Sequence, residues 1–135
     1  TGYEVEDLAT AFIRLADGAT LLLEASWAVH GSAGDDFGLT LYGTEGGAEI
    51  QVKNYNWDDT LRIFTDVAGV PAEVVPQLTR GEGHLAVVRD FVDTVRSGDW
   101  SKEFGEQGLV RARVIDACYA SALEGREVPL EESAV

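Results

Sequence analysis

The first half of the chain alternates apolar and polar residues with a period of two, which is typical of β-strands. Five runs show this alternation, and they lie at residues 5–16, 19–30, 37–43, 48–53 and 60–67. The first two runs flank the turn signal Asp17-Gly18 and therefore predict a hairpin of unusually long strands. Pro71 and Pro76 predict that residues 68–81 are irregular, or an edge strand at most.

Two registers of this hairpin differ in which side chains share a face. A two-residue loop would place Leu21, Leu23 and Trp27 on the same face as Thr10 and Arg14. A three-residue loop, residues 16–18 with Gly18 in the left-handed conformation, gathers the apolar side chains instead. That set is Val5, Ala9, Ala11, Ile13, Leu15, Leu21, Leu23, Ala25, Trp27 and Val29. Because a slip of one residue turns every side chain over, burial favours the three-residue loop.

The hydrophobic period becomes helical after residue 82. One amphipathic helix is predicted over 82–98 and a second over 106–125, each ended by a glycine, Gly98 and Gly125. The second has so many apolar positions that we expect it to be buried on two sides. Strands followed by helices predict an α+β fold, in which two C-terminal helices pack on one face of a mainly antiparallel, open-faced sheet.

The face of the hairpin that the helices would leave open is unusually apolar. In the favoured register it carries Leu8, Phe12 and Leu22, beside polar residues such as Glu24. Scattered surface hydrophobes are one explanation, because such residues are common on protein surfaces. We favour an interface, and predict that this open face forms a homodimer or tetramer.

Composition narrows the possible partners. The 135 residues, with a mass of 14.5 kDa, suffice for one domain, residues 1–135. A formal net charge of −14 disfavours nucleic acid and anionic membranes. The single Cys118 excludes an intramolecular disulfide, and no apolar run approaches the roughly 20 residues that span a bilayer. Without methionine or a visible targeting segment, the chain is expected to be an excerpt of a longer, cytoplasmic protein.

The motifs offer little complete chemistry. The glycine-rich GTEGG at 43–47 lies between two predicted strands, so we interpret it as a hairpin turn rather than a dinucleotide loop, which needs a following helix. His30, Asp35 and Asp36 form a possible acid–base cluster, although an ordinary solvated loop is the alternative. Tyr55 and Trp57 would either stack on a sugar ring or cover the sheet edge.

A metal site is not expected either. His30 and His84 lack ligand spacing, and Cys118 belongs to a helix pattern. The residues alone therefore show no complete active site, so no catalytic, metal or cofactor-binding residue is assigned.

Four stretches together resemble a known family. VEDLATAFIRLADGATLLLEASWA (5–28), YGTEGGAEI (42–50) and the helical pair at 84–98 and 105–130 are similar in order and spacing to the C-terminal domain of the Gfo/Idh/MocA oxidoreductases. The resemblance implies a parent enzyme with an upstream Rossmann domain that binds NAD or NADP. It also implies that this domain lines a sugar or polyol pocket and packs against another subunit.

The family's cofactor fingerprint, catalytic lysine and Asp-xxx-His pair are not found in this stretch, so the chain alone is expected to be inactive. In the family, the loop after the second strand approaches the substrate, so the resemblance implies His30, Asp35 and Asp36 as substrate-binding residues. Two rival hypotheses stay open: a free-standing α+β binding or dimerisation module without cofactor, and a small α+β enzyme with its site at residues 30–36.

Overall fold

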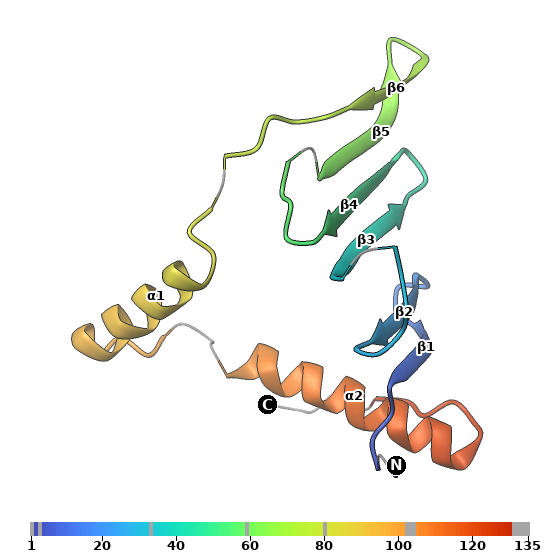
Figure 1. Ribbon diagram of the computed structural model, residues 1–135, viewed down its shortest axis with the longest axis vertical. Helices are drawn as coiled ribbons and strands as arrows, with labels where there is room; N and C mark the ends of the chain where they lie inside the picture. The colour runs from blue at the N-terminus through green and yellow to red at the C-terminus, as the bar shows by residue number, and fades with distance from the viewer. Residues whose placement is uncertain are drawn as a thin grey trace. The chain divides into compact units, whose positions relative to one another are not determined.

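The computed structural model describes Gly2 and residues 4–32, 34–58, 60–79, 81–101 and 105–130. Within these residues, six strands precede two helices, and Figure 1 labels each element. They are β1 (Leu8–Arg14), β2 (Thr20–Ser26), β3 (Asp36–Tyr42), β4 (Gly47–Lys53), β5 (Leu61–Val67), β6 (Val70–Val74), α1 (His84–Ser97) and α2 (Glu106–Glu124). The segregated order and the antiparallel pairing confirm the predicted α+β class.

The chain divides into two compact units. One unit combines Thr1–Leu8 with Ser26–Glu82 and contains the four-stranded sheet. The other combines Ala9–Ala25 with Gly83–Val135 and contains nearly all of the β1–β2 hairpin and both helices. The packing of the helices on a sheet face stays a prediction.

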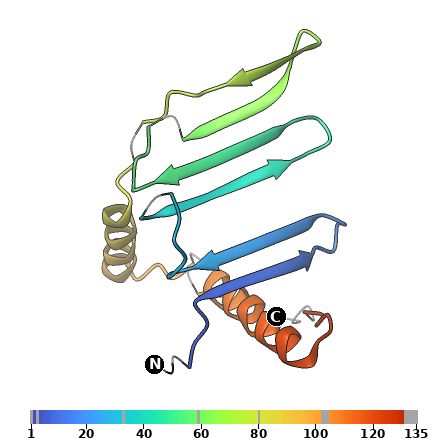
Figure 2. The same ribbon diagram turned by 45° about the vertical axis from the view of Figure 1, so that its right-hand side comes forward.

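The four-stranded sheet sorts most of its side chains by polarity, although Phe64 lies on the polar face. Its order is β3-β4-β5-β6 and every neighbouring pair is antiparallel (Figure 2). Leu39 pairs with Ile50, and Ile50 with Leu61, so apolar residues meet on one face. The register puts the side chains of Asp36, Thr40, Glu49, Gln51, Lys53, Arg62, Asp66 and Glu73 on the other face. One face is therefore suited to solvent and the other to apolar packing.

The sixth strand corrects the prediction of five. Val67 pairs with Val70 around Ala68 and Gly69, whose φ angles of 52° and 78° are both positive. Positive φ at both central residues is the geometry of a tight hairpin turn that matches the twist of its strands. β6 lies at the sheet edge, where Pro71 is tolerated because a missing N–H need not pair there.

The β1–β2 hairpin has the predicted three-residue loop. The N–H of Leu15 donates to the carbonyl of Ala19 at 2.8 Å, and the N–H of Gly18 donates to the carbonyl of Leu15 at 3.0 Å. Gly18 has a φ of 90°, which a residue with a Cβ adopts only with strain. The register that gathers Ile13, Leu15, Leu21 and Leu23 on one face is therefore confirmed.

The expectation of unusually long strands is wrong, because β1 and β2 have seven residues each. Ser26 supplies the reason. Its hydroxyl donates to the carbonyl of Asp7 and accepts from the N–H groups of Ala28 and Val29 at 3.2 and 3.1 Å. A side chain that captures backbone N–H groups in this way turns the chain out of the extended conformation.

The helices end where the glycines predicted. Gly98 and Gly125 adopt left-handed φ angles of 69° and 65°, and their N–H groups donate to the carbonyls of Thr94 and Ser121. The expectation that α2 is buried on two sides is wrong: none of its residues is buried, and Leu123 is 88% exposed. Its apolar residues are spread around the helix rather than gathered in one stripe, so no single contact can cover them.

Candidate functional site

The predicted substrate loop does not form an acid–base cluster. No hydrogen bond or ion pair joins His30 to Asp35 or Asp36 within the described residues. His30 is exposed in the segment after β2, whereas Asp36 opens β3. The three side chains therefore have separate surroundings, and each is considered by what it contacts.

Asp35 is fixed through its backbone by Asn54. The side-chain oxygen of Asn54 accepts hydrogen bonds from the N–H groups of Gly34 and Asp35 at 2.9 and 3.3 Å. The N–H of Asn54 donates to the carbonyl of Asp35 at 2.7 Å. Asn54 and Tyr55 hold positive φ angles of 51° and 58°, which is uncommon for residues other than glycine. The loop before β3 is thus fastened to the turn after β4.

Asp36 joins two side chains of the polar sheet face. Its carboxylate accepts a hydrogen bond from the Gln51 side-chain amide and lies 3.5 Å from the Lys53 ammonium. Asp36 and Lys53 are direct partners in the β3–β4 register. This carboxylate therefore orients Gln51 and Lys53 rather than standing free for a ligand.

These oriented side chains border a polar hollow of about 240 Å³. β4 contributes alternate side chains of one face, and the others come from the loop after β4 and the start of β5. The lining residues are Glu49, Gln51, Lys53, Asn56, Asp58, Thr60 and Arg62. All of them carry polar or charged groups, so the hollow can accept and donate hydrogen bonds on every side.

The loop between β4 and β5 closes one end of this polar hollow. The N–H of Asn56 donates to the carbonyl of Lys53 at 2.9 Å, and the N–H of Asp58 donates to the Asn56 side-chain oxygen at 3.1 Å. The Thr60 hydroxyl donates to the carbonyl of Trp57 at 3.3 Å, and Thr60 is only 8% exposed. Local bonds therefore shape the loop without using the charged groups.

Arg62 has two acidic neighbours across the sheet and forms an ion pair with one of them. It pairs with Glu49 in the β4–β5 register, but its Nε lies 3.6 Å from the carboxylate of Glu73 on β6. Glu49 is half-buried and makes no hydrogen bond or ion pair within the described residues. The polar hollow thus contains a carboxylate whose acceptor capacity is not used by that part of the chain.

The apolar face behind this region carries an aromatic cluster. Phe37 meets Tyr55 and Trp57 edge-on, with ring centroids 6.0 and 5.9 Å apart. Phe37 pairs with Val52, the buried hydrophobic residue of the described chain, whose exposure is 0%. This geometry supports the second alternative for Tyr55 and Trp57, since both rings fold back onto the sheet.

A second hollow, of about 380 Å³, lies at the opposite end of β4. Its walls are apolar side chains and backbone around the Gly43–Gly46 turn, where the N–H of Gly43 donates to the carbonyl of Gly46 at 2.8 Å. The glycine-rich stretch is therefore a hairpin turn between β3 and β4, as predicted. It supplies no helix N-terminus for a pyrophosphate, so these residues do not fit NAD or NADP.

The predicted interface residues lie on the more exposed hairpin face. Phe12 and Leu22 are 67% and 75% exposed, whereas Leu21 on the opposite face is 38% exposed. Leu8 and Glu24 are exposed as well. The difference agrees with the confirmed register, but the oligomer itself stays a prediction.

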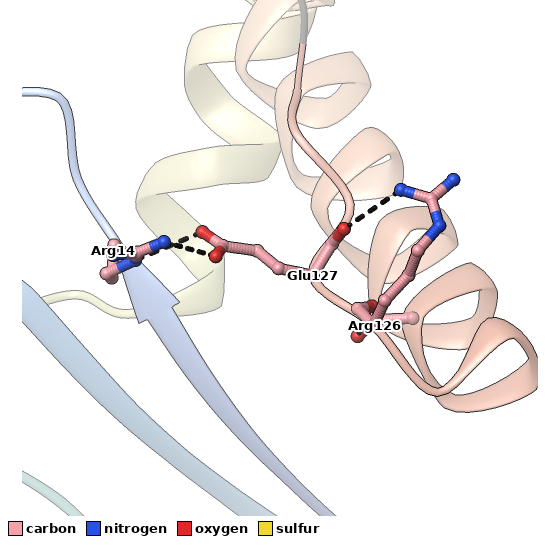
Figure 3. Close-up of polar contacts among 4 residues, drawn as sticks. Arg14, Arg126 and Glu127 are labelled. Carbon is pink, nitrogen blue, oxygen red and sulfur yellow. Dashed lines mark hydrogen bonds and ion pairs between the residues drawn. The ribbon is translucent and has the colours of Figure 1, made fainter.

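One ion pair connects the hairpin to the segment after α2. The Arg14 guanidinium binds the carboxylate of Glu127 through two nitrogens, as Figure 3 shows, and the Arg126 side chain donates to the Glu127 carbonyl at 3.2 Å. The hydrogen bond and the charge of Glu127 raise the pKa of Arg14 above its ordinary value. The Arg14 and Glu127 side chains are both well exposed, so salt screens the pair.

Two features are absent from the described residues. No group of three or more histidine, cysteine, aspartate or glutamate side chains comes together there as metal ligands. Within the same part of the chain, no helix combines the length and apolar character needed to cross a membrane.

The fold and the site define an α+β domain, with antiparallel sheets, C-terminal helices and a polar hollow. The C-terminal alpha/beta domain of an oxidoreductase family matches residues 1–130. The chain belongs to this family, the Gfo/Idh/MocA oxidoreductases, as the resemblance in its sequence indicated. The chain matches no curated protein and no solved structure.

Sequence reasoning missed Glu49, Gln51, Lys53 and Arg62 as site residues. A signal was present, because Glu49, Gln51 and Lys53 alternate along one predicted strand and must therefore share a face. The tight turn at 43–47 also sets the pairing that brings Asp36 opposite Lys53. What the sequence did not contain was the path of the loop that closes the hollow.

Proposed function

We propose that this chain is the substrate-pocket and oligomerisation domain of an NAD(P)-dependent oxidoreductase that acts on a secondary alcohol of a sugar or polyol. Family membership carries the proposal, because it places the chain as the C-terminal alpha/beta domain of an oxidoreductase. A bound nicotinamide would accept the hydride, and an upstream Rossmann domain of the parent protein would hold that cofactor. This chain would contribute binding and orientation, and would be inactive alone.

The polar face of the four-stranded sheet supports the substrate part of the proposal. Recognition of a hydroxyl-rich substrate needs closely spaced hydrogen-bonding groups. The polar hollow supplies such groups, and Asp36, one of the three residues predicted to bind substrate, orients two of them. Asp35 would act through its fixed backbone, and His30 would approach the substrate from the exposed loop.

The hairpin supports the oligomerisation part. Phe12 and Leu22 leave most of their apolar area exposed to water on one face. If a second copy covered this apolar area, the dimer would be stabilised by roughly 25 cal/mol for each Å² removed from water. A second copy would bring the same face, as a symmetric dimer requires, and Leu8 and Glu24 would lie within that contact.

Two measurements test the proposal. The full-length product of the gene, incubated with NAD⁺ or NADP⁺ and a panel of sugars and polyols, should form NADH or NADPH with at least one of them, whereas residues 1–135 alone should form none. Absence of turnover across the panel, in a preparation that binds the nicotinamide cofactor, would contradict the enzymatic part. A gene product that binds no nicotinamide cofactor would favour the free-standing binding module.

Sedimentation tests the other part. At micromolar concentration residues 1–135 should sediment as a dimer or a tetramer. Sedimentation as monomer alone would contradict the oligomerisation role. A dimer in a gene product without nicotinamide-dependent activity would support the dimerisation-module alternative.

A further inference from the structure

We propose that the end of the four-stranded sheet near Gly47 binds a small organic cation, an ammonium ion that carries alkyl groups. The cation would lie between the rings of Tyr42 and Phe64, with the Glu49 carboxylate as its counter-ion. These four residues define the Gly47 slot. Binding of a cation here goes beyond the proposed function, and only Glu49 is shared with the polar hollow.

The strand register places the two rings on either side of a glycine. Gly47 is the direct partner of Tyr42 in the β3–β4 pair and of Phe64 in the β4–β5 pair. Direct partners share a face of the sheet, and two strand spacings, about 10 Å, separate the outer two residues. Because Gly47 has no side chain, β4 places nothing between the two rings.

The backbone explains why this position is a glycine. A Cβ on residue 47 would lie 2.8 Å from the carbonyl oxygen of Leu41, which is closer than van der Waals contact allows. The same Cβ would lie 3.9 Å from Cδ2 of Phe64, which is an ordinary contact distance for carbon. A methyl group of a ligand, slightly farther from the backbone, would clear this oxygen and still touch the Phe64 ring.

Both rings are available to a ligand. Tyr42 is 93% exposed and Phe64 is 39% exposed, and neither ring contacts another aromatic ring within the described residues. Together with Gly47 they line the second hollow of about 380 Å³. The face of an aromatic ring carries negative charge density, so it attracts cations, and alkylated ammonium ions bind well between such faces.

The charged groups beside the Gly47 slot leave it negative. Glu49 lies two residues after Gly47 on the same face, and it is half-buried without a hydrogen bond or ion pair in the described part of the chain. Its partner in the β4–β5 register, Arg62, forms an ion pair with Glu73 instead, so that base and that acid offset one another. The charge of Glu49 is left for a ligand, and the −14 of the whole protein adds to the attraction of a cation.

A metal ion matches this slot less well than an organic cation. No three histidine, cysteine, aspartate or glutamate side chains come together in the described residues. A Ca²⁺ ion, by contrast, takes roughly six to eight oxygen ligands. An alkylated ammonium ion needs only one carboxylate, because it also gains from contact with the two rings.

The test is a titration of the ¹⁵N-labelled chain with choline chloride, followed by NMR. Saturable shifts are expected at Tyr42, Gly47, Glu49 and Phe64. The matched neutral probe is 3,3-dimethylbutan-1-ol, which has the shape of choline with carbon in place of the charged nitrogen, and it should cause no saturable shifts. Added sodium chloride should weaken choline binding, because salt screens the Glu49 charge.

Variants separate the contribution of the ring from that of the charge. Tyr42→Ala should weaken choline binding about fivefold and Tyr42→Phe should not, because the ring face rather than the hydroxyl contacts the cation. Glu49→Gln should weaken binding about fivefold through loss of the counter-charge. Asp58→Asn is the control, since it removes an equal charge from a residue that lines the polar hollow but not the second hollow, and binding should stay within about twofold of wild type.

Four results would overturn the proposal. They are the absence of saturable shifts, equal shifts with the neutral alcohol, unchanged affinity in Tyr42→Ala, and shifts that grow linearly over the whole acidic surface, as a diffuse ion atmosphere would cause. Tyr42 is almost fully exposed, so its replacement should not disturb folding, and the dispersion of each variant's spectrum checks this. If Tyr42→Ala does disturb the spectrum, unchanged affinity in Glu49→Gln overturns the proposal equally.

Discussion

The four-stranded sheet and the β1–β2 hairpin share the same alternation of residues, but they differ in how many of their faces are apolar. In the sheet, the alternation separates an apolar face, which carries the buried Val52 and its cross-strand partner Phe37, from a polar face with cross-strand ion pairs. In the hairpin both faces carry large apolar side chains, represented by Leu21 on one and Leu22 on the other. A strand pair with two apolar faces needs covering on both, whereas the sheet needs covering on only one.

The largest expected effect lies in the sheet. Val52→Ala should lower the free energy of unfolding by about 2 kcal/mol, because it leaves a cavity at a fully buried position opposite Phe37 in the β3–β4 register. Urea denaturation measures the loss. Val70→Ala, on the same face but at the exposed edge, is the control and should change stability by less than about 0.5 kcal/mol. Equal losses at the two positions would mean that the sheet is buried evenly.

In the hairpin, a substitution on the open face should weaken self-association, whereas one on the opposite face should weaken folding. Leu22→Asp should raise the dissociation constant of the predicted dimer at least about tenfold and change the unfolding midpoint little, because it places a charge on the open face. Leu21→Asp, its neighbour on the other face, should mainly lower stability. Sedimentation and thermal unfolding of both variants measure the difference. Equal loss of folding in both would show that Leu22 belongs to a core.

The turns of the two regions offer a matched pair of smaller changes. Gly18→Ala and Gly69→Ala should each destabilise by about 1 kcal/mol, since both glycines have left-handed φ angles and a Cβ would meet no atom within 4 Å. Strain in the backbone is then the whole cost. Gly81→Ala, which has equal space and no positive φ, should be neutral in the same denaturation experiment. A neutral Gly18→Ala would contradict the three-residue loop.

The smallest effect is expected at the ion pair that ends β1. Glu127→Gln should lower the thermal midpoint only slightly at low salt, because both partners are well exposed. The difference from wild type should disappear near 0.5 M sodium chloride, where the screening length is only about 4 Å. A difference that persists at high salt would show that hydrogen bonding rather than charge is responsible.

The parts of the fold that periodicity and turn chemistry control were predictable. Burial forced the register of the first hairpin, and Gly98 and Gly125 marked the ends of the helices. β6 was harder, because Ala68-Gly69 lacks the asparagine or aspartate usual in such turns and Pro71 argued against a strand. The end of β2 depended on one hydroxyl, that of Ser26, which leaves no mark on the hydrophobic pattern.

The candidate site was less predictable than the fold. Asp36 was identified, but as a free acid in a loop, whereas its carboxylate holds Gln51 and Lys53. The polar hollow depends on a loop that bends through the left-handed residues Asn54 and Tyr55, and on the choice of Arg62 between two carboxylates. Both depend on tertiary contacts, and neither leaves a repeating pattern in the sequence.

The bond between Arg14 and Glu127 joins residues that are 113 positions apart. A cut or an added tag directly after α2 would therefore act on the first strand, although every residue of that strand would be unaltered. Proteolysis that removes Glu127 would then be reported by the signals of Arg14, so a fragment designed from this chain retains this bond only if it extends through Glu127.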